Sequence, residues 1–457
     1  MLAQILNRQF VLEQTQDLLE ELRADPGDDA DVLNHLVESE QRELKESSGQ
    51  PGFEPAFAER RGEEWVSLDD SSFFSRDPII SIVQSVLDEH FETNEPDQIE
   101  EQEPADDGRR GPDDDEVAVT NRTIRDYEPF RDQPGRRIFN KFSITDVGWV
   151  RSKVAEGIRL LRRKHPFNAK PAAPVECDDH VRLVLVGDWA TGLPRARKVA
   201  EEIRAVLDDG KAKSLEQHVI HLGDTYYSGW DHEYRKRFLP FWPVTQDESD
   251  TIGSWSINGN HDMYSGGHAY YDVLLDDPRF YKQQKSSFFS LYNKHWRILG
   301  LDTAWQDGTL ENPQADWVGE QLGGDNQTGL LLSHHQPFSA YEKSKPTIRR
   351  LLKPVLDSEK IRAWFWGHEH RCMLFKPHAN VHFGRCVGHG GVPVYMTHRS
   401  DDPYPEPGEY EYREYIKKGF ERWALFGFAV LEFDGPSIGV RYIDEDGEVH
   451  KAEELTT

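Results

Sequence analysis

The stretch that decides the fold is HVIHLGDTYYSG, residues 218–229. Its apolar first half is typical of a buried strand, and Gly223-Asp224 ends that strand in a turn. One Gly-Asp after a strand usually forms nothing more than a turn. Here four other apolar runs also end in Asp, Asn or His, and their ends read Gly187-Asp188, Gly259-Asn260-His261-Asp262, His334-His335 and Gly367-His368-Glu369-His370.

From residue 181 onward, short apolar runs alternate with helical stretches, which is typical of an α/β domain. Ligands of such domains bind beyond the carboxyl ends of the strands, so we expect the five strand ends to converge. Clustered Asp, Asn and His side chains indicate a metal site, and this mixture of donors suits Fe, Mn or Zn better than Mg or Ca. Two cations about 3.5–4 Å apart would activate water and hold a phosphoryl oxygen.

The order Asp, Gly-Asp, Gly-Asn-His-Asp, x-x-His and Gly-His-x-His resembles the signature of the calcineurin-like metallophosphoesterase superfamily. The resemblance covers about residues 181–457. It implies an α/β fold, an αββα sandwich of two sheets flanked by helices, which here follows a mainly helical N-terminal extension. It also implies a phosphoric ester hydrolase with two metal ions, in which a metal-bridging hydroxide attacks phosphorus in line.

The same resemblance implies a role for each residue of the five motifs. Asp188 and His370 would bind the first metal, and Asp224 would bridge the two metals. The ligands of the second metal would be Asn260, His334 and His368.

Three further residues are expected to act on the substrate rather than to bind metal. His261 resembles the histidine that contacts phosphate or protonates the leaving group, and Asp262 would orient it. The pair His334-His335 is ambiguous, because either residue fits a ligand motif. We favour His334, which is nearer the strand end, and expect His335 to face the substrate.

The first motif departs from most of the superfamily, because Ala190 stands where a histidine ligand is usual. The purple acid phosphatase branch replaces that histidine with a tyrosine three residues after the second aspartate, which here is Tyr227. A ferric ion paired with Fe, Zn or Mn would follow from that likeness. Strand alternation points Tyr226 to the other face, where it would pack. His389, in a Gly-rich turn, is expected either to line the site or to belong to an ordinary turn.

The composition changes along the chain and predicts four regions. Residues 1–91 are expected to be helical and to form a bundle or a site for a protein partner, with Asp77 as one N-cap. Residues 92–120 are acidic and Pro-containing, and predict a disordered linker. Residues 121–180 are expected to connect as a helical segment, and residues 181–457 to form the phosphoesterase domain, with a closing hairpin around Asp434-Gly435.

The chain has 457 residues, a formal net charge of −28 and a mean hydropathy of −0.73. This charge argues against nucleic acid as a partner. The resemblance to the phosphoesterases implies a small phosphate ester as substrate. Three cysteines indicate no disulfide framework, and neither a signal peptide nor a membrane-spanning run is evident, so we expect a cytoplasmic protein with no membrane association. Two alternatives remain: a phosphodiesterase or nucleotide hydrolase using two divalent metals, and a catalytically weak binding protein recruited through its N-terminal helices.

Overall fold

The structure is a computed structural model, and it describes residues 164–324, 327–342, 346–394, 396–416 and 422–457, together with parts of the N-terminal region at 11, 14–16, 18–20, 23, 58–61, 64–67, 75, 77–93, 130–133 and 136–138. The chain divides into two compact units. One comprises residues 161–457 with 1–3, and the other comprises residues 4–160. Each is described by itself.

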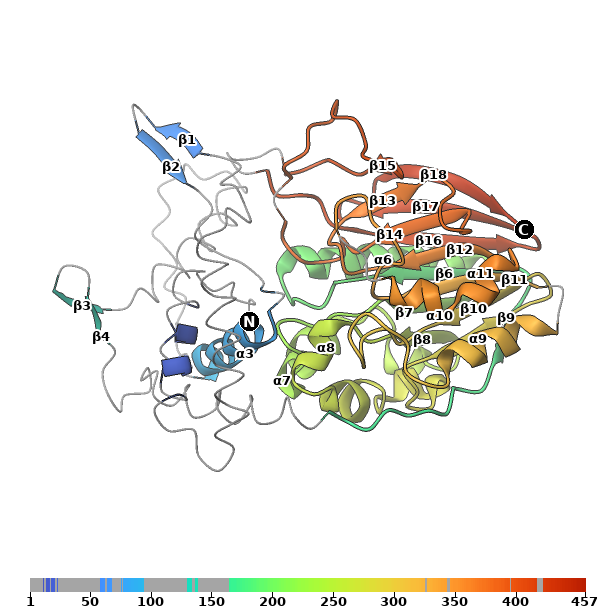
Figure 1. The fold of residues 1–457 in the computed structure, drawn as a ribbon, viewed down its shortest axis with the longest axis horizontal. Coiled ribbons are helices and arrows are strands. Elements are labelled where there is room, and N and C mark those ends of the chain that lie inside the picture. The colour runs from blue at the N-terminus through green and yellow to red at the C-terminus, as the bar shows by residue number, and fades with distance from the viewer. Residues whose placement is uncertain are drawn as a thin grey trace. The chain divides into compact units, whose positions relative to one another are not determined.

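The larger unit is built on two β-sheets (Figure 1). The first sheet has six strands in the order β18-β17-β16-β6-β7-β8. Its strands are β6 (Val181–Val186), β7 (Glu216–His221), β8 (Ile252–Ser256), β16 (Gly427–Asp434), β17 (Ser437–Asp444) and β18 (Val449–Thr456). Strands β6, β7 and β8 run parallel. Strands β16 and β17 form the predicted hairpin around Asp434-Gly435, in which Gly435 has a φ of 58°.

The second sheet has eight strands in the order β15-β13-β14-β12-β11-β10-β9-β5. Its strands are β5 (Val175–Glu176), β9 (Phe289–Tyr292), β10 (Trp296–Gly300), β11 (Thr328–Ser333), β12 (Ile361–Trp366), β13 (Cys372–Phe375), β14 (Phe383–Val387) and β15 (Gly408–Glu411). Strands β10, β11, β12 and β14 run parallel. Because β5 pairs with β9, the sandwich begins before the predicted boundary at residue 181.

Helices cover the outer face of each sheet, so the predicted αββα sandwich is confirmed. Buried side chains such as Leu185, Trp255 and Phe365 fill the space between the sheets. Helix α6 (Pro194–Ala212) packs against the six-stranded sheet through an apolar stripe that includes Val199 and Ile203. The remaining helices and helical turns of this unit are Asp231–Glu233 (α7), Tyr234–Phe238, Gln246–Glu248, Asn260–Tyr264 (α8), Tyr270–Leu274, Pro278–Gln283, Gln314–Gly323 (α9), Thr347–Leu351 (α10) and Lys353–Asp357 (α11).

The smaller unit contains one well-defined helix among its described residues, α3 (Pro78–Thr93). It begins where the sequence predicts, because the Oδ1 atom of Asp77 accepts a hydrogen bond of 2.8 Å from the backbone N–H of Ile80. The described residues between 11 and 23 are also helical, and Val11, Leu18 and Leu19 are buried.

Four short strands accompany these helices: β1 (Ala58–Arg61), β2 (Glu64–Ser67), β3 (Phe130–Gln133) and β4 (Arg136–Ile138). The last two strands pair antiparallel, with Phe130 opposite Ile138 and Arg131 opposite Arg137. These residues are thus strands within the segment 121–180 that is expected to be helical. The helix expected at 31–46, and the acidic linker beyond Thr93, lie outside the described residues.

Within the part of the chain that the structure describes, no helix is both long enough and apolar enough to cross a bilayer.

Candidate metal centre

The predicted ligand residues follow the ends of parallel strands in both sheets. Asp188, Asp224 and Asn260 come after β6, β7 and β8 of the six-stranded sheet. The three histidines come from the eight-stranded sheet, where His334 follows β11 and both His368 and His370 follow β12. Because parallel strands end at the same edge of a sheet, these side chains meet where the two sheets face each other.

Asp224 belongs to two groups of side chains whose ligand atoms lie within 4.8 Å of one another. One group is Asp188, Asp224 and His370, and the other is Asp224, His334 and His368. The Nε2 atom of His334 lies 3.3 Å from the Oδ1 atom of Asp224, and the Nε2 atom of His370 lies 3.4 Å from the Oδ1 atom of Asp188. The structure therefore brings together the aspartate expected to be shared and both sets expected around it.

Asn260 joins the second group through its amide oxygen. That oxygen lies 3.0 Å from the Nε2 atom of His334, which is itself 3.1 Å from the Nδ1 atom of His368. The other ring nitrogen of His334, Nδ1, lies 2.9 Å from the carbonyl oxygen of Leu222. A hydrogen bond donated there directs the Nε2 lone pair of His334 toward Asp224 and Asn260, as is usual for metal-binding histidines.

The donor set fits two cations. Asp188 and Asp224 are both buried and adjacent, and burial, with the charge of Asp188 as a further contribution, raises the pKa of Asp224. Burial also lowers the pKa of His334 to about 3, which keeps the ring neutral and able to bind a metal. Buried carboxylates of like charge are costly unless cations compensate them. Carboxylate, amide and imidazole donors together match Fe, Mn or Zn.

Tyr226, rather than Tyr227, brings its hydroxyl to the first group. Its oxygen lies 3.1 Å from Asp188 Oδ1, 3.0 Å from Asp224 Oδ2 and 2.9 Å from His370 Nε2. The ring of Tyr227 lies beneath the guanidinium of Arg237, at 5.2 Å. This arrangement differs from the one expected for the two tyrosines, because strand β7 ends at His221 and strand alternation does not apply to the turn that follows.

Ala190 explains how Tyr226 reaches this position. The segments containing Ala190 and Thr225 pair in parallel, and the backbone N–H of Tyr226 donates a hydrogen bond of 3.2 Å to the carbonyl oxygen of Ala190. The phenol then lies against Asp188 at the side of the first motif that lacks a histidine. The sequence indicates a tyrosine near the site at Tyr226-Tyr227, but it does not determine which of the two side chains reaches Asp188.

Asp262 holds the backbone around Asp224, which differs from its predicted role of orienting His261. Its carboxylate accepts hydrogen bonds from the N–H groups of Asp224 (2.8 Å), Thr225 (3.1 Å) and Gly259 (2.7 Å), and from the hydroxyl of Tyr234. Burial, with a further contribution from Asp224, raises the pKa of Asp262 to about 7.

His261 is oriented by the backbone instead. Its Nδ1 atom forms a hydrogen bond with the carbonyl oxygen of Tyr227. Its backbone N–H donates a hydrogen bond of 2.9 Å to the Oδ1 atom of Asp224. Its Nε2 atom lies 3.9 Å from the other carboxylate oxygen of Asp224. The ring is therefore beside the two groups and in neither of them.

His335 also lies beside the second group. Its Nδ1 atom is 3.1 Å from the hydroxyl of Thr303, its Nε2 atom is 2.9 Å from Asp307, and its ring centre is 4.7 Å from that of His368. Thr303 and Asp307 have no motif that sequence reasoning could have found. His335 therefore lies beside His334 and His368, and its expected contact with the substrate stays a prediction.

Three glycines let the chain pass close to the carboxylates. A Cβ atom on Gly259 would lie 2.1 Å from Asp224 Oδ1, and one on Gly367 or Gly388 would lie 2.7 or 2.9 Å from Asp188 Oδ2. Side chains there would displace the carboxylates. His389, next to Gly388, does not line the centre, because its ring packs near Tyr412.

Parts of this chain are similar to known proteins. Residues 181–372 match the family model described as calcineurin-like phosphoesterase. A stretch of 87 residues is 29% identical to a probable cyclic nucleotide phosphodiesterase of Synechococcus sp., and the match spans 17% of this chain and 34% of the relative. The alignment thus includes about a third of that relative's length.

Solved structures that match part of this chain include GAP50, the anchor in the inner membrane complex of Plasmodium. It is 12% identical, with a TM-score of 0.47, and the match covers 61% of this chain and 89% of GAP50. A dimetal phosphatase from Danio rerio is 12% identical, with a TM-score of 0.40, over 63% of this chain and 99% of the phosphatase.

Proposed function

We propose that this chain is a metal-dependent phosphoric ester hydrolase in which two cations share Asp224. The observation that carries the proposal is the pair of ligand groups, Asp188–Asp224–His370 and Asp224–His334–His368, which have this one carboxylate in common. The match to the calcineurin-like phosphoesterase model supports the reaction class. When bound, the cations would activate water and neutralise charge on the phosphoryl group.

The side chains of the site would have two further roles, to position the cations and to protonate the leaving group. The carboxylates and imidazoles fix two positions in a buried and therefore poorly screened place, where charge stabilisation is strongest. His261 would give a proton from Nε2 to the leaving oxygen, since its Nδ1 atom is held by the carbonyl of Tyr227. Burial lowers the pKa of His261 to about 4, and an anionic ester beside the ring would favour its protonated form.

Turnover of model esters tests this proposal. We expect protein loaded with Fe, Mn or Zn to hydrolyse an aryl phosphate monoester, and chelation to abolish that activity. A bis-aryl diester and a cyclic nucleotide belong in the same assay, because the Synechococcus relative is named as a probable cyclic nucleotide phosphodiesterase. If the protein binds two equivalents of metal but hydrolyses none of these esters, a binding role would replace the enzymatic one.

We further propose that Tyr226 is the phenolate ligand of a purple acid phosphatase-like iron centre, with Fe, Zn or Mn as the second metal. The support is the hydroxyl of Tyr226 within 3.1 Å of Asp188, Asp224 and His370, on the side where Ala190 replaces histidine. Iron-loaded protein should then be coloured, and Tyr226→Phe should lose the visible absorption.

Tyr227→Phe is the matched control, because it removes the same atom from the adjacent residue. It should keep the absorption of the wild type. An iron-loaded, active and colourless wild type would contradict the phenolate assignment and leave the shared aspartate unaffected.

A further inference from the structure

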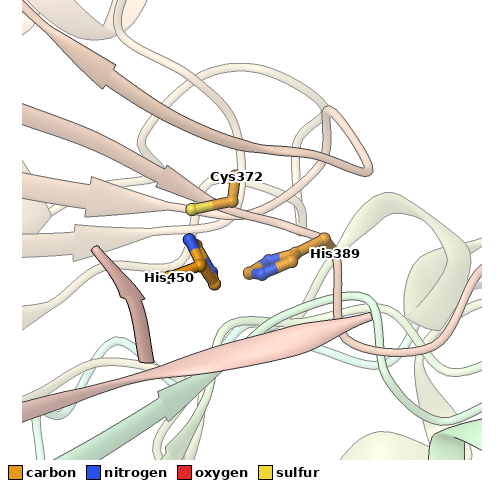
Figure 2. A group of neighbouring side chains, drawn as sticks. All are labelled: Cys372, His389 and His450. Carbon is orange, nitrogen blue, oxygen red and sulfur yellow. The ribbon is translucent and has the colours of Figure 1, made fainter. Parts of the chain in front are cut away.

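A second group of potential metal ligands lies between the sheets: Cys372, His389 and His450. Figure 2 shows the three side chains pointing toward a common space. One ligand atom from each lies within 4.8 Å of the others. Cys372 opens β13 and His389 follows β14, both in the eight-stranded sheet, whereas His450 is in β18 of the six-stranded sheet. The group therefore joins the two layers at a place separate from the first centre.

The imidazoles of this group have unused hydrogen-bonding atoms. His389 is 4% exposed, and neither of its ring nitrogens has a hydrogen-bond partner among the described residues. The Nε2 atom of His450 is likewise buried without such a partner. Leaving a buried polar atom unpaired is costly. Two histidines with such atoms next to a buried thiol point to a shared ligand.

Two neighbouring tyrosines fix the orientation of the His450 ring. The Nδ1 atom of His450 lies 3.0 Å from the hydroxyl of Tyr410, and the ring stacks on Tyr412 at 3.6 Å. A hydrogen bond donated by Nδ1 to that hydroxyl leaves the Nε2 lone pair for a metal. Burial lowers the pKa of His450 to about 4 and also holds the pKa of His389 well below its usual value, which keeps both rings neutral.

The backbone around these ligands is fixed on both sides. The carbonyl oxygen of His389 accepts a hydrogen bond of 2.9 Å from the N–H of Gly427, and that of Cys372 accepts one of 3.0 Å from the N–H of Tyr412. The ligand atoms would close in slightly around an ion with bonds of about 2.3 Å to sulfur and 2.0–2.1 Å to nitrogen.

A comparable group elsewhere in the domain lacks these properties. Cys177 and Glu216 both lie near the Nε2 atom of His218, at 3.5 and 3.0 Å, and the Nδ1 atom of that ring accepts a hydrogen bond from Trp255. Every ring nitrogen of His218 thus has a protein partner. That group is explained by hydrogen bonding alone.

We infer that Cys372, His389 and His450 form a second metal site, which binds a borderline-soft ion such as Zn²⁺. One thiolate and two imidazoles favour such ions over the hard cations that prefer oxygen ligands. The ion would connect β13, the loop after β14 and β18. The same loop contains Gly388, which packs against Asp188, so the ion also supports one wall of the first centre.

Cobalt substitution of the full chain tests this inference. The first centre contains no cysteine among its ligand groups, so a near-ultraviolet thiolate-to-cobalt charge-transfer absorption can come only from a site with a cysteine. We expect Co²⁺-loaded wild type to show it, and Cys372→Ser to lose it together with about one equivalent of bound metal. Cys177→Ser is the matched control and should keep the absorption.

Two further variants separate this site from folding defects and from the proposed function. His450→Gln, at a half-buried position, should also weaken the charge-transfer absorption if Cys372→Ser fails to fold. Asp224→Asn should keep it, since that change affects only the first centre. Absence of the absorption in cobalt-loaded wild type, or its loss in Cys177→Ser and not in Cys372→Ser, would overturn the inference whether or not the protein hydrolyses esters.

Discussion

Asp224→Asn is expected to lower kcat/KM for ester hydrolysis by on the order of 10³-fold, because the substitution removes the charge that both cations would share. Asparagine keeps the oxygen that accepts the 2.9 Å hydrogen bond from the N–H of His261, so the fold around it should survive. The measurement is steady-state turnover together with the metal content of the purified variant, which should fall below that of wild type.

Asp434→Asn gives a matched control, since it removes the same charge from a side chain that is 81% exposed in the β16–β17 hairpin. Its activity should stay within about twofold of wild type, as is usual for exposed positions away from a site. Near-normal activity and two bound metals in Asp224→Asn would refute the shared-carboxylate assignment.

Asp262→Ala is expected to lower the free energy of unfolding of the metal-free protein by about 3–5 kcal/mol. The substitution leaves the buried N–H groups of Asp224, Thr225 and Gly259 without their acceptor, and each unsatisfied donor costs about 1–3 kcal/mol. Denaturant unfolding in the presence of a chelator measures this loss without a contribution from metal binding.

Tyr234→Phe serves as the comparison, because it removes only one of the hydrogen bonds to Asp262 and leaves the three backbone bonds. Its cost should be about 1 kcal/mol. Equal losses in the two variants would show that the backbone bonds to Asp262 contribute little to stability.

The six residues proposed as metal ligands can be located from the sequence because each follows an apolar run near the end of a parallel strand. Asp188, Asp224 and His334 each lie within three residues of a strand end, and the hydrophobic pattern of the sequence locates that strand end. Tyr226 could not be chosen over Tyr227 in the same way, since the turn after β7 has no fixed side-chain period. Its orientation depends on pairing with the distant Ala190 segment.

Other features depended even more on tertiary structure. Asp262 was assigned to its sequence neighbour His261, while its partners are backbone groups brought together by two different strand ends. Cys372, His389 and His450 form no motif at all, because consecutive members lie 17 and 61 positions apart in the sequence. Only the packing of β18 against the other sheet brings them together.

The first centre would also contribute to the stability of the packing between the two sheets. Its oxygen donors come from the six-stranded sheet and its imidazoles from the eight-stranded sheet, so neither layer alone offers the mixed set. An ion that requires both kinds of donor binds the joined layers and not the separated ones. By mass action such an ion favours the joined state. The concentration of free metal would then affect the stability of this fold as well as the proposed hydrolytic activity.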